Sequence, residues 1–133
     1  MKIKEVKKSI IKQFDEGLLR RKCPSYFIIE VFSINNYFEE FEKYYLLSKN
    51  FKREKLDVSF NDYLKYYLLE EDISNILENI YNVFGDIKGV YTVSRKALDR
   101  LENNNVTTFY YIEDVIFVEF LNYCLCLMIG NNE

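Results

Sequence analysis

Three carboxylates near the C-terminus are the residues best placed by type and spacing to act as acids or bases. Glu113 and Asp114 are adjacent, and Glu119 follows them in an apolar run. Acid–base catalysis by carboxylates needs two of them held across a cleft with their pKa values driven apart. Glu113 and Asp114 instead stand between two apolar runs, where adjacent turn residues point in different directions. The pattern favours a solvated turn over a catalytic pair.

A second acidic group, Glu70-Glu71-Asp72, could be imagined as a site for a divalent cation. The alternating Asp spacing of a calcium-binding loop is absent there. Acids at this position are more typical of a corner between two helices. Because the group lies within the most acidic segment, with seven acids and one base between Asp57 and Ile87, a protein-binding surface is the better functional interpretation.

Three cysteines, Cys23, Cys124 and Cys126, are the only candidate thiolate ligands or nucleophiles. Cys124 and Cys126 alternate within an apolar run, as buried core cysteines do. The sequence has no histidine to complete a tetrahedral zinc site, so we expect no metal and no cofactor. An odd number of cysteines, and a start (K-I-K-E-V-K-K after Met1) without the apolar core of an export signal, predict a cytoplasmic protein.

Tyrosine is unusually frequent, with twelve residues and the doublets Tyr44-Tyr45, Tyr66-Tyr67 and Tyr110-Tyr111. In each doublet one ring can face the core while the other points elsewhere. Exposed tyrosines are common at protein interfaces, because the ring is rigid and apolar and its tip is polar. The alternative is that the doublets form the half-buried rim of an aromatic core.

The charges are unevenly distributed along the chain. Residues 1–22 carry eight Lys or Arg against three Asp or Glu, whereas the other residues carry ten against eighteen. An acidic body is a poor surface for nucleic acid but attracts a basic protein, because complementary potentials speed and orient encounter.

Helical patterns dominate the first two thirds of the chain. They cover 3–16, extended by Leu18-Leu19, and 37–50 after a cap at Asn35 or Asn36. The run 26–33 is compatible with a strand or a buried helix, and we favour a strand. Residues 51–58 are interpreted as a charged connector. Ser59, with Asp62 three positions later, predicts a helix start, and that helix is expected to end at Glu70-Glu71-Asp72.

A second helix is then expected from Ile73 to Phe84, with Asp72 as its cap and Gly85 as its stop. Residues 89–93 read as a short strand, and Ser94 caps a helix that ends near Asn103. The last stretch divides into strands at 106–112, 115–120 and 123–129, with turns at Glu113-Asp114 and Leu121-Asn122. The strand at 123–129 is apolar on both faces and should be covered on both. We therefore predict one α+β domain, 1–133, with N-terminal helices packed on a C-terminal antiparallel β-meander of three to four strands.

The C-terminal quarter, T107-T-F-Y-Y-I-E-D-V-I-F-V-E-F and L127-M-I-G-N-N-E133, resembles small bacterial immunity proteins that guard against contact-dependent growth inhibition and related polymorphic toxins. The resemblance implies a cytoplasmic, non-enzymatic inhibitor of one cognate toxin domain, frequently a basic nuclease.

We expect the partner to be bound by acidic and tyrosine side chains of the helical corner and of the last strands. The candidate contacts are Tyr66, Tyr67, Glu70, Glu71, Asp72, Glu113, Asp114 and Glu119. The alternative is a regulatory or adaptor domain that contacts nucleic acid or protein through its basic N-terminal helix, with Lys4, Lys8, Lys12, Arg20, Arg21 and Lys22. Neither reading predicts membrane insertion, and both leave the oligomeric state open.

Overall fold

A computed structural model describes residues 3–45, 52–104, 109 and 111–131. Its elements follow the order α1 (Ile3–Arg21), β1 (Tyr26–Ser33), α2 (Tyr37–Tyr44), β2 (Arg53–Lys55), α3 (Phe60–Leu64), α4 (Glu70–Phe84), β3 (Gly89–Val93), α5 (Arg95–Asn103), β4 (Tyr111–Glu119) and β5 (Tyr123–Asn131). The predicted α+β class is confirmed.

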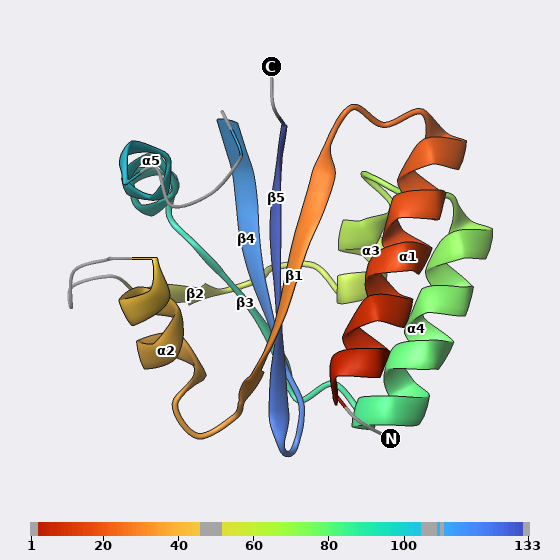
Figure 1. Ribbon diagram of the computed structural model, residues 1–133, viewed down its shortest axis with the longest axis horizontal. Helices are drawn as coiled ribbons and strands as arrows, with labels where there is room; N and C mark the ends of the chain where they lie inside the picture. Colours follow the sequence, from red (N-terminus) through yellow and green to blue (C-terminus); the bar gives the residue numbers. More distant parts are fainter. Residues whose placement is uncertain (1–2, 46–51, 105–108, 110, 132–133) are drawn as a thin grey trace.

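The strands form one antiparallel sheet in the order β1-β5-β4-β3-β2 (Figure 1). The first strand therefore pairs with the last, as Tyr26 opposite Gly130 and Ser33 opposite Tyr123. Within the described residues the sheet has five strands, because Arg53–Lys55 pairs with β3. The interpretation of this segment as a connector was wrong: its charged side chains suit a short edge strand that discourages further pairing.

The two strands predicted at 106–112 and 115–120 are one strand wherever the structure describes them. β4 runs through Glu113 and Asp114, and the pairing moves from Ile112 opposite Gly130 to Asp114 opposite Ile129. One residue, Glu113, is thus extra, which defines a β-bulge rather than the predicted turn. The turn predicted at Leu121-Asn122 does join β4 to β5. A β-bulge changes the direction of side chains without ending the strand. In the sequence, its two polar residues interrupt an apolar run in the same way as the residues of a turn.

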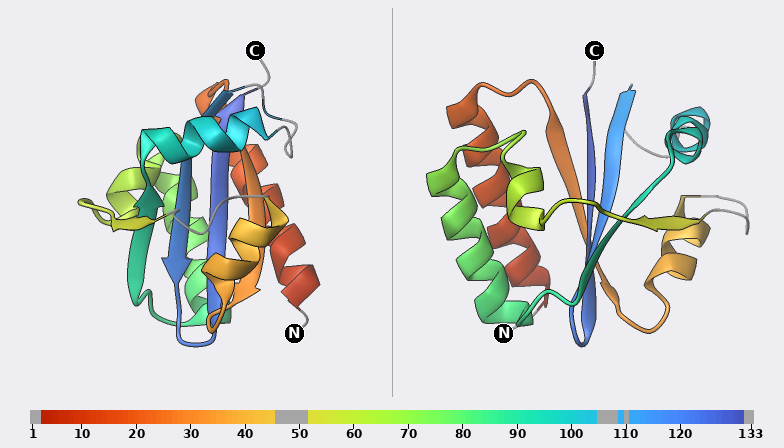
Figure 2. Two further views of the ribbon diagram at one scale, coloured as in Figure 1. Left: turned by 90° about the vertical axis from the view of Figure 1, so that its left-hand side faces the viewer. Right: turned by 180° about the vertical axis from the view of Figure 1, so that it is seen from behind.

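The sheet lies between two helical layers: α1, α3 and α4 cover one face, and α2 and α5 cover the other (Figures 1 and 2). The central strand β5 has alternate side chains in two cores. Leu125, Leu127 and Ile129 pack with the first layer, and Cys124, Cys126 and Met128 pack with the second. The expectation of a strand covered on both faces is confirmed.

The helical corner differs from its prediction at both helix ends. α3 ends at Leu64 and not at Glu70-Glu71-Asp72. α4 begins at Glu70 with Leu69 as its N-cap residue, so the prediction of Asp72 as the cap was wrong. The three acids at 70–72 therefore lie in the first turn of α4, where the helix dipole favours negative charge, and not at a helix C-terminus. Gly85 ends α4 with φ of +85°, a conformation that glycine adopts without strain.

Candidate functional site

An exposed surface lies where α3 gives way to α4. We call Tyr66, Leu69, Glu70 and Glu71 the corner surface. Tyr66 is 72% exposed, Leu69 is 41% exposed, and the side chain of Glu70 is 83% exposed. All four residues are exposed, and they lie within one short stretch of the chain, from Tyr66 to Glu71. Of the predicted contacts, Tyr66, Glu70 and Glu71 are therefore open to a partner.

Asp72, also predicted as a contact, is used inside the molecule. It is 7% exposed, and Arg20 Nε donates to both carboxylate oxygens, at 3.0 and 3.1 Å. The neighbouring Arg21 Nη1 donates to the Leu68 carbonyl at 3.0 Å. Two cations of the basic N-terminal segment thus fasten α1 to the start of α4, and they reduce the negative charge of this end of the molecule.

Tyr67, Glu113 and Asp114 belong to a polar cluster at the bulge, under α3. Tyr67 Oη donates to Glu113 Oε2 at 3.3 Å, and Ser25 Oγ donates to Glu113 Oε1. Asp114 accepts from Tyr63 Oη at 2.9 Å and from Thr92 Oγ1 at 2.7 Å. We call these six residues the bulge cluster.

The bulge cluster holds its carboxylates with hydroxyl groups rather than opposing them across a cleft. Burial raises the pKa of Tyr67 to about 12 and raises the pKa of Tyr63 further. These hydroxyls therefore remain protonated donors at neutral pH. The arrangement supports the bulge and offers no acid–base pair to a substrate.

Glu119 lies on the other face of the sheet, in a group that the sequence pattern did not reveal. Arg53 Nη1 donates to Glu119 Oε2 at 3.0 Å, and Tyr37 Oη donates to the same carboxylate. The guanidinium carbon of Arg53 lies 5.2 Å from the ring centroids of Tyr37 and Tyr91 and 5.3 Å from that of Phe38. The residues of this group come from α2, β2, β3 and β4. Because these elements are far apart in the sequence, no spacing pattern along the chain could have predicted the group. It borders an open cavity of about 460 Å³.

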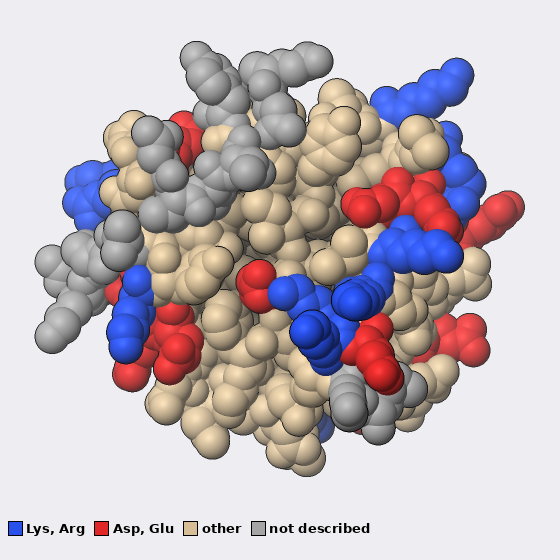
Figure 3. All heavy atoms as spheres, in the orientation of Figure 1, with Lys and Arg blue, Asp and Glu red and all other residues tan. Residues whose placement is uncertain are grey.

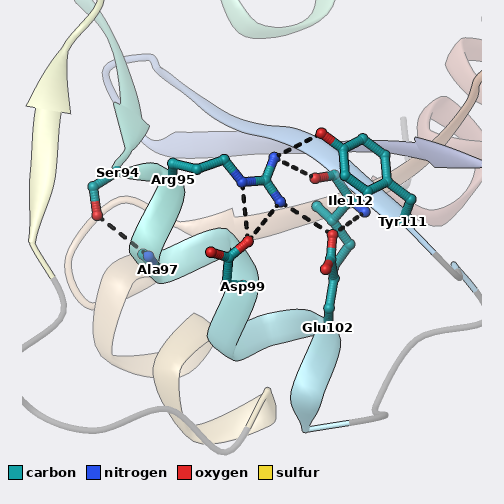
Figure 4. Close-up of polar contacts among 7 residues, drawn as sticks. All are labelled: Ser94, Arg95, Ala97, Asp99, Glu102, Tyr111 and Ile112. Atoms are coloured by element: carbon teal, nitrogen blue, oxygen red, sulfur yellow. Dashed lines mark hydrogen bonds and ion pairs between the residues drawn. The ribbon is translucent and has the colours of Figure 1, made fainter.

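Arg95 organises a further polar group that holds α5 to β4 (Figure 4). Its guanidinium donates to Asp99 at 3.0 Å, to Glu102 at 3.1 Å and to the Ile112 carbonyl at 3.0 Å. It also lies over the ring of Tyr111, 5.0 Å from the centroid. Every charged group drawn is paired within the chain, so we assign this group to docking of α5.

The described residues contain no group of three or more His, Cys, Asp or Glu side chains that could hold a metal ion. Cys124 and Cys126 are buried, and burial raises the pKa of both thiols, which keeps them in the unreactive protonated form. Among the residues that the structure describes, no helix is both long enough and apolar enough to cross a bilayer.

Comparison with protein-family models, with curated proteins and with solved structures finds no match to this chain.

Proposed function

We propose that this chain is a non-enzymatic binding protein, most concretely a bacterial immunity protein that neutralises a cognate toxin domain by direct contact through the corner surface. The observation that carries the proposal is the exposure of Tyr66 beside Leu69, Glu70 and Glu71. An aromatic ring and an aliphatic side chain next to two exposed carboxylates combine an anchor with electrostatic recognition.

The partner that suits this surface is basic. Glu70 has one ion partner among the described residues, Lys65, at 3.8 Å, and the side chains of Lys65 and Glu70 are 45% and 83% exposed. Such a pair contributes little to stability, so Glu70 can exchange Lys65 for a partner's cation at small cost. A basic nuclease domain, as the resemblance at the C-terminus implies, has this character.

Of the other predicted contacts, Asp72 and Tyr67 support the corner surface from behind, and the remaining three lie elsewhere. Asp72 and Tyr67 each bind side chains of other elements, which fixes the geometry of the corner. Glu113 and Asp114 are enclosed in the bulge cluster, and Glu119 lies on the opposite face of the sheet. We therefore propose Tyr66, Leu69, Glu70 and Glu71 as the contact set.

The first test is whether a basic toxin domain is encoded beside this protein, and its absence would count against the proposal. Where such a domain is found, isothermal titration calorimetry measures its affinity. The double variant Glu70→Lys/Glu71→Lys should weaken binding about tenfold or more, and Tyr66→Ala should weaken it by a similar factor. The matched control is Glu5→Lys/Glu40→Lys, which reverses two exposed acids on α1 and α2 and should leave the affinity unchanged. Equal losses of affinity in the two double variants would mean that only the net charge of the protein matters. Unchanged affinity after the substitutions at 66, 70 and 71 would refute the contact set.

The alternative, an adaptor that binds nucleic acid through α1, retains one specific observation: Lys4, Lys8 and Lys12 are exposed at helical spacing. Arg20 and Arg21, in contrast, bind groups within the chain. A salt-dependent shift of DNA or RNA that disappears on neutralising the three lysines would favour this alternative over toxin binding.

A further inference from the structure

One edge of the sheet is short and charged, whereas the other is long and apolar (Figure 1). β2, at the first edge, has three residues, all charged and exposed. β1, at the second edge, has eight residues, and Glu30 is its single charged residue. Edge strands pair with strands of other molecules unless short length, charge or a cover prevents it. The length and composition of β1 do not prevent such pairing, so any protection comes from a cover.

The outward backbone groups of β1 follow from its pairing with β5. Ile34 N donates to Asn122 O at 3.1 Å, which continues the register of the two strands by one pair. In an antiparallel ladder, every second residue exchanges hydrogen bonds with the neighbouring strand. The even-numbered residues of β1 therefore bond to β5. The N–H and C=O groups that point away from the sheet are those of Phe27, Ile29, Val31 and Ser33. The backbone hydrogen bonds that the described residues form outside helices and strands include none at these four positions.

Lys7 of α1 reaches round this outer edge. Glu30 alternates with Ile28 and Phe32, which pack in the core under α2 and α5, so its side chain starts on that face of the sheet. α1 covers the opposite face, yet Lys7 Nζ donates to Glu30 Oε2 at 2.8 Å (Figure 1). Because β5 continues the sheet on the inner side of β1, the ion pair passes over the outer side.

The ion pair covers backbone that otherwise lies open to solvent. Ile29 is 2% exposed although its N–H and C=O groups point outward, whereas Ser33, at the end of the strand, is exposed. The side chains of Lys7 and Glu30 are 31% and 33% exposed. A partly solvated ion pair contributes little to stability, so this cover opens at small cost.

The chemistry of the edge matches a second copy of β1. Apolar side chains border the edge on both faces: Val31 on the face under α1, and Ile28 and Phe32 on the face under α2, are each partly exposed. A strand that pairs here must be apolar and of similar length. β1 of a second copy meets both conditions, whereas β2 meets neither. The basic partner that suits the corner surface does not match this apolar border.

We propose that the Lys7–Glu30 ion pair is a removable cover on the edge of β1, and that the uncovered strand pairs antiparallel with β1 of a second copy of this chain. A two-fold axis at Ile29 lets Phe27 of each copy exchange hydrogen bonds with Val31 of the other. The same register places each Glu30 opposite Ile28 of the other copy, which keeps the two carboxylates apart. This self-association does not rest on the proposed function.

The decisive variant is Lys7→Ala, which removes the cover and leaves the backbone of β1 unchanged. Sedimentation velocity over a concentration series measures the dimer dissociation constant, at ~0.15 M salt so that the lysines of α1 in the two copies are screened. Lys7→Ala should lower this constant about tenfold or more relative to the unsubstituted chain, and Glu30→Gln should act in the same direction. Lys8→Ala is the matched control, since it makes the same change in charge at an exposed position of α1.

Backbone-amide hydrogen exchange, followed by NMR, locates the contact. In Lys7→Ala, the amides of Phe27, Ile29 and Val31 should exchange more slowly as the protein concentration rises, and those of β2 should not change. Circular dichroism confirms that the variants fold.

The proposal is overturned if Lys7→Ala associates no more than Lys8→Ala, or if a dimer forms without slower exchange in β1. Assemblies larger than a dimer also overturn it, because they require an open-ended contact in place of a two-fold one. The substitutions at 66, 70 and 71 leave β1 unchanged, so failure of this proposal and failure of the proposed function are separate outcomes.

Discussion

The tyrosine doublets show how one residue type serves two roles in adjacent positions. Tyr45 is 3% exposed and packs on Phe41, whereas Tyr44 is 66% exposed. Tyr66 is exposed, whereas Tyr67 is half-buried with its hydroxyl on Glu113. The expected division of each pair is confirmed for these two, and Tyr110 of the third pair lies outside the described residues.

Four buried tyrosine hydroxyls make the stability of the folded state depend on pH in the alkaline range. Burial is the main cause of a raised pKa at Tyr37, Tyr45, Tyr63 and Tyr67. In the unfolded chain these groups ionise near pH ~10. The folded state then binds more protons than the unfolded state, so stability is constant below that pH and falls as the pH rises above it.

We therefore expect the midpoint of thermal unfolding to fall steeply above pH ~10, with part of the tyrosine absorbance change near 295 nm appearing only on unfolding. Tyr63→Phe and Tyr67→Phe should each flatten the fall, since they remove an ionisable group. Tyr44→Phe, at an exposed position, is the control and should leave the slope unchanged. A pH profile that is flat up to pH ~12 would contradict the assignment of these hydroxyls as buried donors.

At the scale of single elements, two helices, α3 and α5, begin where a serine caps them. Ser59 accepts a hydrogen bond from Asp62 N at 3.1 Å, and Ser94 accepts one from Ala97 N at 3.3 Å. Asn36 precedes α2 without a side-chain cap, so only part of the predicted capping is confirmed. Caps are local, which is why the two serines could be identified from sequence spacing.

Ser94→Ala should lower the free energy of unfolding by about 1 kcal/mol, because the backbone N–H of Ala97 loses its hydrogen-bond acceptor. Urea denaturation measures this change. Ser74→Ala, at an exposed position inside α4, is the control and should be neutral or slightly stabilising, since alanine is the better helix former. A cap variant that is no less stable than the control variant would show that Arg95 alone holds the start of α5.

At the scale of the whole molecule, the charge asymmetry of the sequence is partly cancelled in space. Arg20 binds Asp72, and Lys7 binds Glu30 on β1 at 2.8 Å. Figure 3 accordingly shows acidic and basic side chains beside one another on the face it displays, rather than on separate halves. Recognition of a basic partner then depends on local groups such as the corner surface more than on the overall field.

The two cores share the strand β5, so we expect them to unfold together. Leu127→Ala removes a buried side chain from the core under α1 and α4, and Met128→Ala removes one from the core under α2 and α5. Each should cost about 2–5 kcal/mol. Fluorescence and circular dichroism should still give coincident transitions. Leu121→Ala, 71% exposed, is the control. Separate transitions for the two layers would contradict the prediction of a single domain.

The sequence by itself determined what depends on neighbours within a few positions. These features are the helix periodicity, the serine caps, the stop at Gly85, the strand at 89–93 and the two-sided burial of the last strand. Each follows from a repeat of 3.6 or 2 residues or from a short turn signal. The run at 26–33 was compatible with a strand or a buried helix, and the structure decided for the strand. The α+β class followed from these elements.

Only the tertiary structure decided where the polar groups go. A turn and a bulge look alike at Glu113-Asp114, because both are polar interruptions of an apolar run. Continued pairing with β5 on both sides makes it a bulge, and the hydroxyls of Tyr63, Tyr67 and Thr92 hold its two carboxylates. Asp72 became internal and Arg53 became part of a cavity for the same reason, since their partners are distant in sequence. Pairing between residues that are distant in the sequence depends on how the helical layers pack on the sheet. The spacing of residues along the chain does not contain this information. The proposed contact set therefore keeps three residues predicted from the sequence, Tyr66, Glu70 and Glu71. It omits the predicted residues whose side chains bind partners from distant parts of the fold.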